Sequence, residues 1–157
     1  MPLPQSLERV RQHPGMYLSP VEFDVVAAFL QGFHVATCSG LLEGFREWLV
    51  VKLGHGSNLA WSQLALHLAF PDAPSPRQRL SEHGGQQHAV EVLFRLLEEY
   101  WQAKESPQGL RRIFVDYQHW IQRQDWYGPS SPDYVASETG PEALAVPHLV
   151  SRRKKQA

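Results

Sequence analysis

The feature that most constrains the fold is a stripe of apolar residues between Gln86 and Lys104. Apolar side chains recur there at intervals of three and four residues, at Val90, Leu93, Phe94, Leu97, Tyr100 and Trp101. An α-helix repeats every ~3.6 residues, so this spacing places all six side chains on one helical face. A helix with one broad apolar face needs other elements to cover that face. The stripe therefore predicts an α-helix packed inside a larger helical domain.

Shorter stripes of the same spacing flank this segment, and alternating strand patterns are nearly absent. We expect helices over residues 5–12, 20–36, 41–54, 58–70, 86–104 and 107–126. A chain of 157 residues is long enough to bury a core without disulfides or metals. These observations predict an all-α fold, a single-domain bundle of five to six helices over residues 1–128. Proline, serine and glycine punctuate residues 129–157 and predict an irregular, partly disordered tail there.

The expected start of the second helix carries the most detailed local signals. Ser19 is a residue type that caps helices, Pro20 suits the first helical position, and Glu22 completes a capping box. We therefore expect the helix to begin here, with the Ser19 hydroxyl accepting a backbone N–H. Ser57 and Ser106 are expected to cap the helices that follow them in the same way.

The turn before this helix has the sequence HPGMY, at residues 13–17. Pro14 ends the first helix because the residue before a proline is pushed out of the helical region. Met16, Tyr17 and Leu18 follow, and all three are apolar or aromatic. We expect them to be the apolar anchors that hold this turn against the domain.

The overall composition excludes several classes of protein. Hydrophobic residues make up 43% of the chain, charged residues 20%, and the formal net charge is -1. This balance is typical of a globular domain and gives no electrostatic footprint for nucleic acid over the chain as a whole. The single cysteine, Cys38, excludes an internal disulfide and a cysteine-based zinc cluster. No apolar run approaches the roughly 20 residues that span a bilayer, so we expect a soluble cytoplasmic protein.

Residues Leu7–Pro20, LERVRQHPGMYLSP, resemble the N-terminal Arg-Pro-Gly-Met-Tyr region of the gyrase and topoisomerase ATPase family. That resemblance implies a following helix with a glutamate base and a magnesium-binding asparagine, and a later Asp-x-Gly-x-Gly loop for adenine. The only asparagine in the sequence, Asn58, lies far from the expected helix, and Asp72 is followed by Ala73-Pro74. We expect no ATPase activity, because no phosphate-binding element is present in the sequence.

Two groups of metal-ligating residue types remain. His34 and Cys38 are four residues apart on one expected helix, a spacing that puts both on the same face. Near the start of the 86–104 helix, His83 and His88 lie close in sequence to Glu82 and Glu91. Neither group has the spacing of a known metal or catalytic motif. We interpret them as a small polar patch and a solvated helix entry, and predict no catalytic, cofactor-binding or metal-binding residues.

The chain has five tryptophans, and Trp, Tyr and Arg are frequent in interface hot spots, so the aromatic cluster at the end of the last helix either contacts a protein partner or clamps the tail to the bundle. The Pro-Gly-Met-Tyr segment followed by an aromatic helical bundle resembles small bacterial proteins, some of them similar to immunity proteins that neutralise secreted toxins. We expect a non-catalytic protein-binding module. The resemblance implies that its partner is a toxin. The candidate contact residues are Glu98, Glu99, Asp116, Trp120, Arg123, Trp126 and Tyr127.

Two alternatives stay open from the sequence. The basic run Arg152–Lys155, with Arg111, Arg112 and Arg123, is compatible with a nucleic-acid-associated regulatory protein. A metal-dependent enzyme centred on His34 or His88 is a third class, for which the purified protein would contain zinc, iron or manganese. The sequence leaves the oligomeric state and the identity of the partner open.

Overall fold

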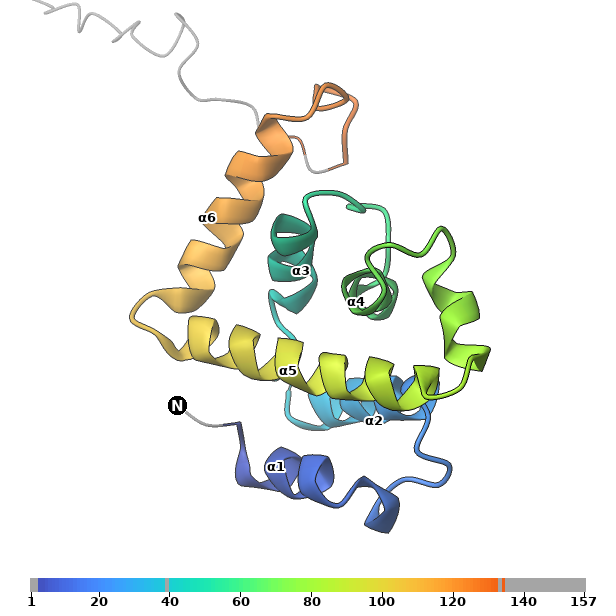
Figure 1. Cartoon of the computed structure of the whole chain (residues 1–157). Helices are drawn as coiled ribbons and strands as arrows, with labels where there is room; N and C mark the ends of the chain where they lie inside the picture. The colour runs from blue at the N-terminus through green and yellow to red at the C-terminus, as the bar shows by residue number, and fades with distance from the viewer. Residues whose placement is uncertain (1–2, 39, 133, 135–157) are drawn as a thin grey trace, which may run out of the picture. The chain divides into compact units, whose positions relative to one another are not determined.

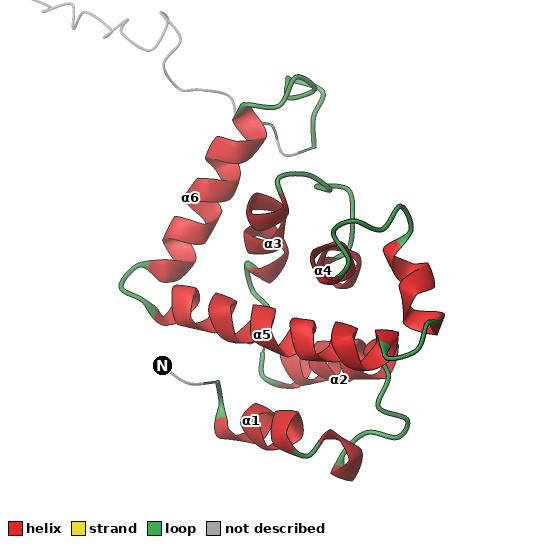
Figure 2. Ribbon diagram, viewed as in Figure 1, coloured by secondary structure: helices red, strands yellow, loops and turns green. Residues whose placement is uncertain are grey.

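The fold is described from a computed structural model of the chain, and the description covers residues 3–38, 40–132 and 134. These residues form six α-helices and two 3₁₀-helices, joined by turns and loops, and they contain no strand (Figure 2). The elements are α1 (Gln5–Gln12), η1 (Pro14–Met16), α2 (Phe23–Ala36), α3 (Phe45–Leu53), α4 (Trp61–Ala69), η2 (Pro76–Ser81), α5 (Gly85–Glu105) and α6 (Gly109–Gln122). The predicted all-α fold is confirmed. None of the helices in these described ranges is long and apolar enough to cross a membrane.

Helix α5 is the central element of the domain. It contacts α2, α3, α4, α6 and η2, and Figure 1 shows it running across the domain with α3 and α4 on one side and α1 on the other. The predicted apolar stripe is buried along α5, except for Trp101, which is half-buried. Ala89, Val92 and Leu96 are buried as well, so α5 packs against neighbours on more than one face.

Aromatic side chains join α3, α4 and α5 in the core. The ring of Phe45 lies 4.9 Å from that of Tyr100 and 5.7 Å from that of Trp61, measured between centroids, in tilted arrangements that aromatic pairs favour. Tyr100 is fully buried, and its hydroxyl donates a hydrogen bond to the backbone carbonyl of Glu43. Burial raises the pKa of Tyr100, because the phenolate would lose its hydration.

Three helices begin later than their serine signals predicted. Helix α2 begins at Phe23, with extended Glu22 before it and no side-chain cap from its own segment, so the predicted Ser19 capping box is wrong. The Oε1 atom of Gln86, on α5, instead accepts the backbone N–H of Phe23 at 2.8 Å. Helix α4 begins at Trp61, with Ala60 rather than Ser57 before it.

Ser106 ends a helix rather than beginning one. It is the C-cap residue of α5, and its hydroxyl donates to the carbonyl oxygen of Ala103 at 2.6 Å. Serine hydroxyls bond nearby backbone groups in turns as readily as at helix starts. The residue type therefore marks a helix boundary here without saying on which side the helix lies.

The chain divides into two compact units, Met1–Gln122 and Arg123–Ala157. Helix α6 ends at Gln122, four residues before the predicted end at Trp126. In the second unit, the Ser131 hydroxyl donates to the carbonyl of Trp126 at 3.1 Å and accepts the N–H of Gly128 at 3.0 Å. This closes a turn that ends the chain's described part. Of the expected tail over residues 129–157, residues 133 and 135–157 lie outside that part.

Candidate functional site

The candidate site is a groove of about 950 Å³ between α1 and α5, called here the α1–α5 groove. One wall consists of Arg11, Pro14 and Val21, from the end of α1, from η1 and from the loop that follows η1. The other wall is α5 with the turn before it, and comprises Glu82, Gly84, Gln86, Gln87, Val90, Glu91, Phe94, Arg95 and Glu98. A volume of this size is typical of a site that holds a ligand or a short segment of a partner.

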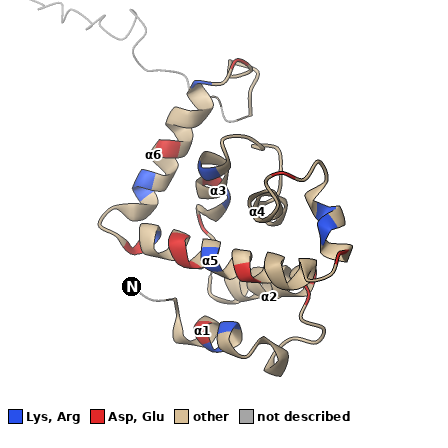
Figure 3. Cartoon of the chain, viewed as in Figure 1, with Lys and Arg blue, Asp and Glu red and all other residues tan. Residues whose placement is uncertain are grey.

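The floor of the groove is apolar and its rim is charged. Val90 and Phe94 lie one turn apart on α5 and line the floor, where they are 7% and 3% exposed. The rim carries Glu91 and Glu98, and Figure 3 shows both signs of charge along α5. An apolar centre surrounded by a polar, solvent-accessible rim is the arrangement found in protein interfaces.

Arg11 connects the two walls. Its guanidinium donates to Glu98 at 3.2 Å, across the groove, and to Glu8 at 2.8 Å, one turn back on α1. The hydrogen bond from Arg11 holds the pKa of Glu8 below its ordinary value, because it stabilises the ionised carboxylate. The same bond raises the pKa of Arg11. Both side chains are partly exposed, so this network fixes the geometry of the wall more than it stabilises the fold.

Glu91 is the rim carboxylate that lacks an ion pair among the described residues. Its Oε1 accepts a hydrogen bond from the Gln87 amide at 2.8 Å. The nearby cation Arg95 lies 4.0 Å from Glu99, which also receives a 2.7 Å contact from Lys52. Each cation of the groove is therefore associated with a carboxylate, while Glu91 presents a negative charge to solvent.

The loop beside the groove exposes two large apolar side chains. Met16 is 78% exposed and Tyr17 is 52% exposed, whereas Leu18 is buried. The prediction that all three anchor the turn is therefore right for Leu18 and wrong for the other two. Met16 and Tyr17 lie between Pro14 and Val21 in the chain, and both of those residues line the groove. Leu18 alone reaches the core from this loop, so its neighbours are left at the surface.

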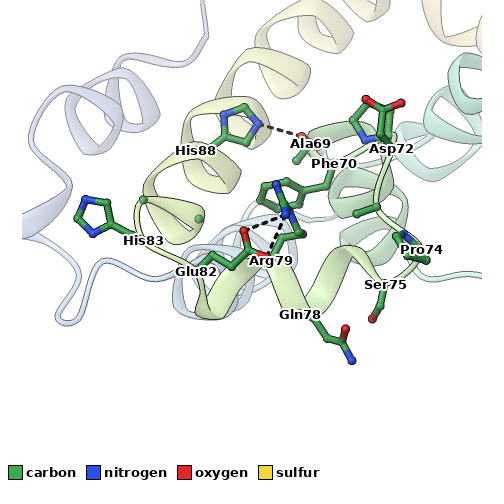
Figure 4. Close-up of a pocket in the computed structure, with 14 residues that line it drawn as sticks. Ala69, Phe70, Asp72, Pro74, Ser75, Gln78, Arg79, Glu82, His83 and His88 are labelled. Carbon is green, nitrogen blue, oxygen red and sulfur yellow. Dashed lines mark hydrogen bonds and ion pairs between the residues drawn. The ribbon is translucent and has the colours of Figure 1, made fainter.

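A second cavity, of about 760 Å³, lies between the end of α4, η2 and the start of α5 (Figure 4). His88 bonds the carbonyl oxygen of Ala69 at 2.9 Å and packs its ring 5.2 Å from that of Phe70. Arg79 pairs with Glu82 at 2.9 Å. His83 points away from the other polar side chains in this view. Three polar side chains of this cavity, Arg79, Glu82 and His88, are thus engaged within the protein.

Of the pair expected to share a helical face, His34 lies on α2, whereas Cys38 lies beyond the end of α2 at Ala36, so that expectation is wrong. The Nδ1 atom of His34 accepts the backbone N–H of Leu42 at 3.0 Å, which ties the end of α2 to the loop before α3. Cys38 is exposed and has a positive φ of 53°. Within the described ranges, no three His, Cys, Asp or Glu side chains are grouped so that they could hold a metal ion.

The predicted contact residues of the first unit fall on two helices. Glu98 and Glu99 are on α5, where Glu98 lines the groove and Glu99 pairs with Lys52. Asp116 is exposed on α6. Trp120 is 8% exposed and stacks on Tyr117 at 6.2 Å between centroids, so its side chain offers little area to a partner.

The other predicted contact residues belong to the second unit. Trp126 is 51% exposed, Arg123 is exposed, and Tyr127 packs its ring 5.4 Å from that of Tyr134. The basic run Arg152–Lys155, on which the nucleic-acid alternative depends, lies outside the described residues.

The residues that sequence reasoning missed are Arg11, Gln87, Glu91, Met16 and Tyr17. A signal for Gln87 and Glu91 was present, since both lie on the same helical face as Glu98. No signal in the sequence showed that α1 would supply the opposite wall.

Comparison with known protein families, curated proteins and solved structures finds no match to this chain.

Proposed function

We propose that this chain is a non-catalytic protein-binding module and that the α1–α5 groove, with Met16 and Tyr17, is its contact surface. The observation that carries the proposal is the exposure of these two side chains, 78% and 52%, beside a groove with an apolar floor. Exposure of large apolar side chains to water is unfavourable, and burial of these side chains against a partner is favourable. Methionine and tyrosine are also among the residues enriched in interfaces.

The resemblance of the Pro-Gly-Met-Tyr segment and its helical bundle to small bacterial proteins, some of them similar to toxin-immunity proteins, supports a finer form of this proposal. In that form the partner is a secreted bacterial toxin, and the module neutralises it by covering part of its surface. A basic toxin would be attracted by the carboxylates of the groove, including Glu91 and Glu98. The first partner to examine is therefore the product of the gene next to the one that encodes this chain.

Site-specific photocrosslinking tests the proposal. A photoreactive phenylalanine analogue is placed at Tyr17 and, as a matched control, at Val35, which is 66% exposed on α2 and does not line the groove. We expect one covalent adduct from the Tyr17 position in the native host and none from Val35. The adduct protein is then purified and its affinity for the unlabelled chain is measured by calorimetry.

A groove-filling variant makes this experiment specific. Gln87 is exposed and lines the groove, so Gln87→Trp narrows it without disturbing the core. An excess of unlabelled wild-type protein, present before irradiation, should lower the yield of the adduct, and the same excess of unlabelled Gln87→Trp protein should not. Equal adducts from Tyr17 and Val35, or no adduct from Tyr17, would overturn the proposal.

A further inference from the structure

We propose that the segment of the partner that occupies the α1–α5 groove is a basic amphipathic helix, an inference that rests on the protein-binding function proposed above. The length of the groove supports a helix. Along α5 the lining runs from Gln86 to Glu98, a distance of about 18 Å at ~1.5 Å per residue. A partner helix of about three turns spans the same length.

The shape of the floor supports an amphipathic helix. Pro14 and Val21 are half-buried while Val90 and Phe94 are almost fully buried, so the groove leaves only a narrow apolar strip open. A narrow strip accommodates one row of apolar side chains, which a helix provides at every third or fourth residue. Met16 and Tyr17 lie in the chain between the lining residues Pro14 and Val21, so they would add apolar contact next to the groove.

The charges of the rim support a basic helix. Arg11 is already bonded to both Glu8 and Glu98, and Arg95 lies nearest to Glu99. An acidic partner would therefore find the cations of the groove engaged and would meet Glu91 directly. A lysine or arginine of the partner would instead complete an ion pair with Glu91, and like charges at this position would be repelled.

The spacing of the rim carboxylates sets the pattern of the partner. Glu91 and Glu98 are seven residues apart on α5, which separates them by about 10.5 Å along the helix axis. Arg11 bonds only the Oε2 atom of Glu98, so a partner helix aligned with α5 would match Glu91 and the Oε1 atom of Glu98 with two basic residues that are also seven positions apart. The inferred motif is a basic pair at this spacing beside a row of apolar residues.

Selection from a display library of randomised helix-forming peptides, each about 14 residues and about 21 Å long, tests this inference without knowledge of the natural partner. The immobilised wild-type chain is the target, and peptides that also bind the Gln87→Trp chain are removed. We expect the remaining peptides to be enriched in lysine or arginine at a spacing of seven, beside an apolar row. Enrichment of acidic or neutral peptides, or no groove-dependent enrichment, would overturn the inference.

Titration of one enriched peptide, made synthetically, provides the matched measurement. Glu91→Lys should weaken its binding by more than about tenfold, because the substitution reverses the charge that faces the peptide. Asp116→Lys, at an exposed carboxylate outside the groove, changes the net charge equally and should change binding by less than about twofold. Equal losses in both variants would show only general attraction and would overturn the inference.

The two proposals fail in different ways. Groove-dependent peptides without a basic pattern would remove the basic helix and leave protein binding at the groove intact. Absence of an adduct at Tyr17 in the host would remove the protein-binding function itself, whatever peptides the library yields.

Discussion

Gln86 of α5 caps the start of α2, because its Oε1 atom accepts the backbone N–H of Phe23 at 2.8 Å. The two residues are 63 positions apart in the chain. The bond joins α2 to the part of α5 that lines the groove, and so couples the start of one helix to the position of another. An N–H at a helix start lacks a partner within its own helix, and this contact supplies one.

Replacement of Gln86 should therefore destabilise the domain where replacement of Ser19 does not. We expect Gln86→Ala to lower the free energy of unfolding by about 1 kcal/mol, the usual effect of losing a helix cap. Ser19→Ala should change it by less than about 0.5 kcal/mol, because α2 begins at Phe23. Urea denaturation followed by circular dichroism measures both, and a larger loss for Ser19→Ala would contradict this assignment of the cap.

The positions of the helices were largely predictable from the sequence, while their starts were not. Apolar spacing in α1 and α5 gave bounds within about two residues, because burial of a helical face is a repeated, local signal. The start of α2 depends on Gln86, which is distant in the chain, so no pattern around Ser19 could have revealed it.

The candidate site was predictable only in part. Glu98 was identified as a contact residue, but its partner Arg11 comes from another helix, and the groove exists only because the two pack together. Met16 and Tyr17 illustrate the same limit. Hydrophobicity predicts that a side chain will be covered, but it does not say whether its own chain or a partner covers it.

Gly85 should not tolerate a larger side chain. A Cβ atom at this position would overlap the backbone carbonyl of Arg79, where η2 meets α5, and backbone atoms cannot move aside cheaply. We expect Gly85→Ala to lower the free energy of unfolding by about 1 to 3 kcal/mol, the usual effect of overpacking. Gly15→Ala is the control, since nothing lies within 4 Å of a Cβ there, and equal effects in thermal denaturation would contradict the close packing at Gly85.

The Glu8–Arg11 contact should make part of the stability depend on pH. The Arg11 hydrogen bond lowers the pKa of Glu8 from its ordinary value of 4.5. The folded state therefore binds this proton less tightly than the unfolded state does. The stabilisation is complete above pH 4.5 and is lost as the pH falls through the lowered pKa of the folded state.

Denaturation at several pH values tests this directly. The difference in unfolding free energy between wild type and Glu8→Gln should be constant near neutral pH and should shrink below pH 4.5. The effect is small because both side chains are partly exposed. A difference that grows on acidification would contradict the direction of the shift.

Tyr100 should ionise at a higher pH than an ordinary tyrosine. Burial raises its pKa from the ordinary value of 10.0, so the folded state holds this proton more tightly than the unfolded state. Its contribution to stability is complete below pH 10.0 and is lost as the pH rises through the raised pKa. Ultraviolet absorbance titration of the folded wild type should show a phenol whose pKa lies above 10.0, and this phenol should be absent from Tyr100→Phe. Identical titration curves above pH 10.0 for the two proteins, apart from the amplitude of one ordinary tyrosine, would contradict this.

The most direct test of the central claim compares stability with binding at the exposed pair. Met16 and Tyr17 are 78% and 52% exposed, so their joint replacement by serine should change the unfolding free energy by less than about 1 kcal/mol. The affinity for the crosslinked partner should fall by more than about tenfold, since buried apolar anchors dominate interface energies. Val35→Ser, at an equally exposed apolar residue away from the groove, should change neither quantity. Unchanged affinity in the Met16→Ser, Tyr17→Ser variant would contradict the assignment of this surface as the binding site.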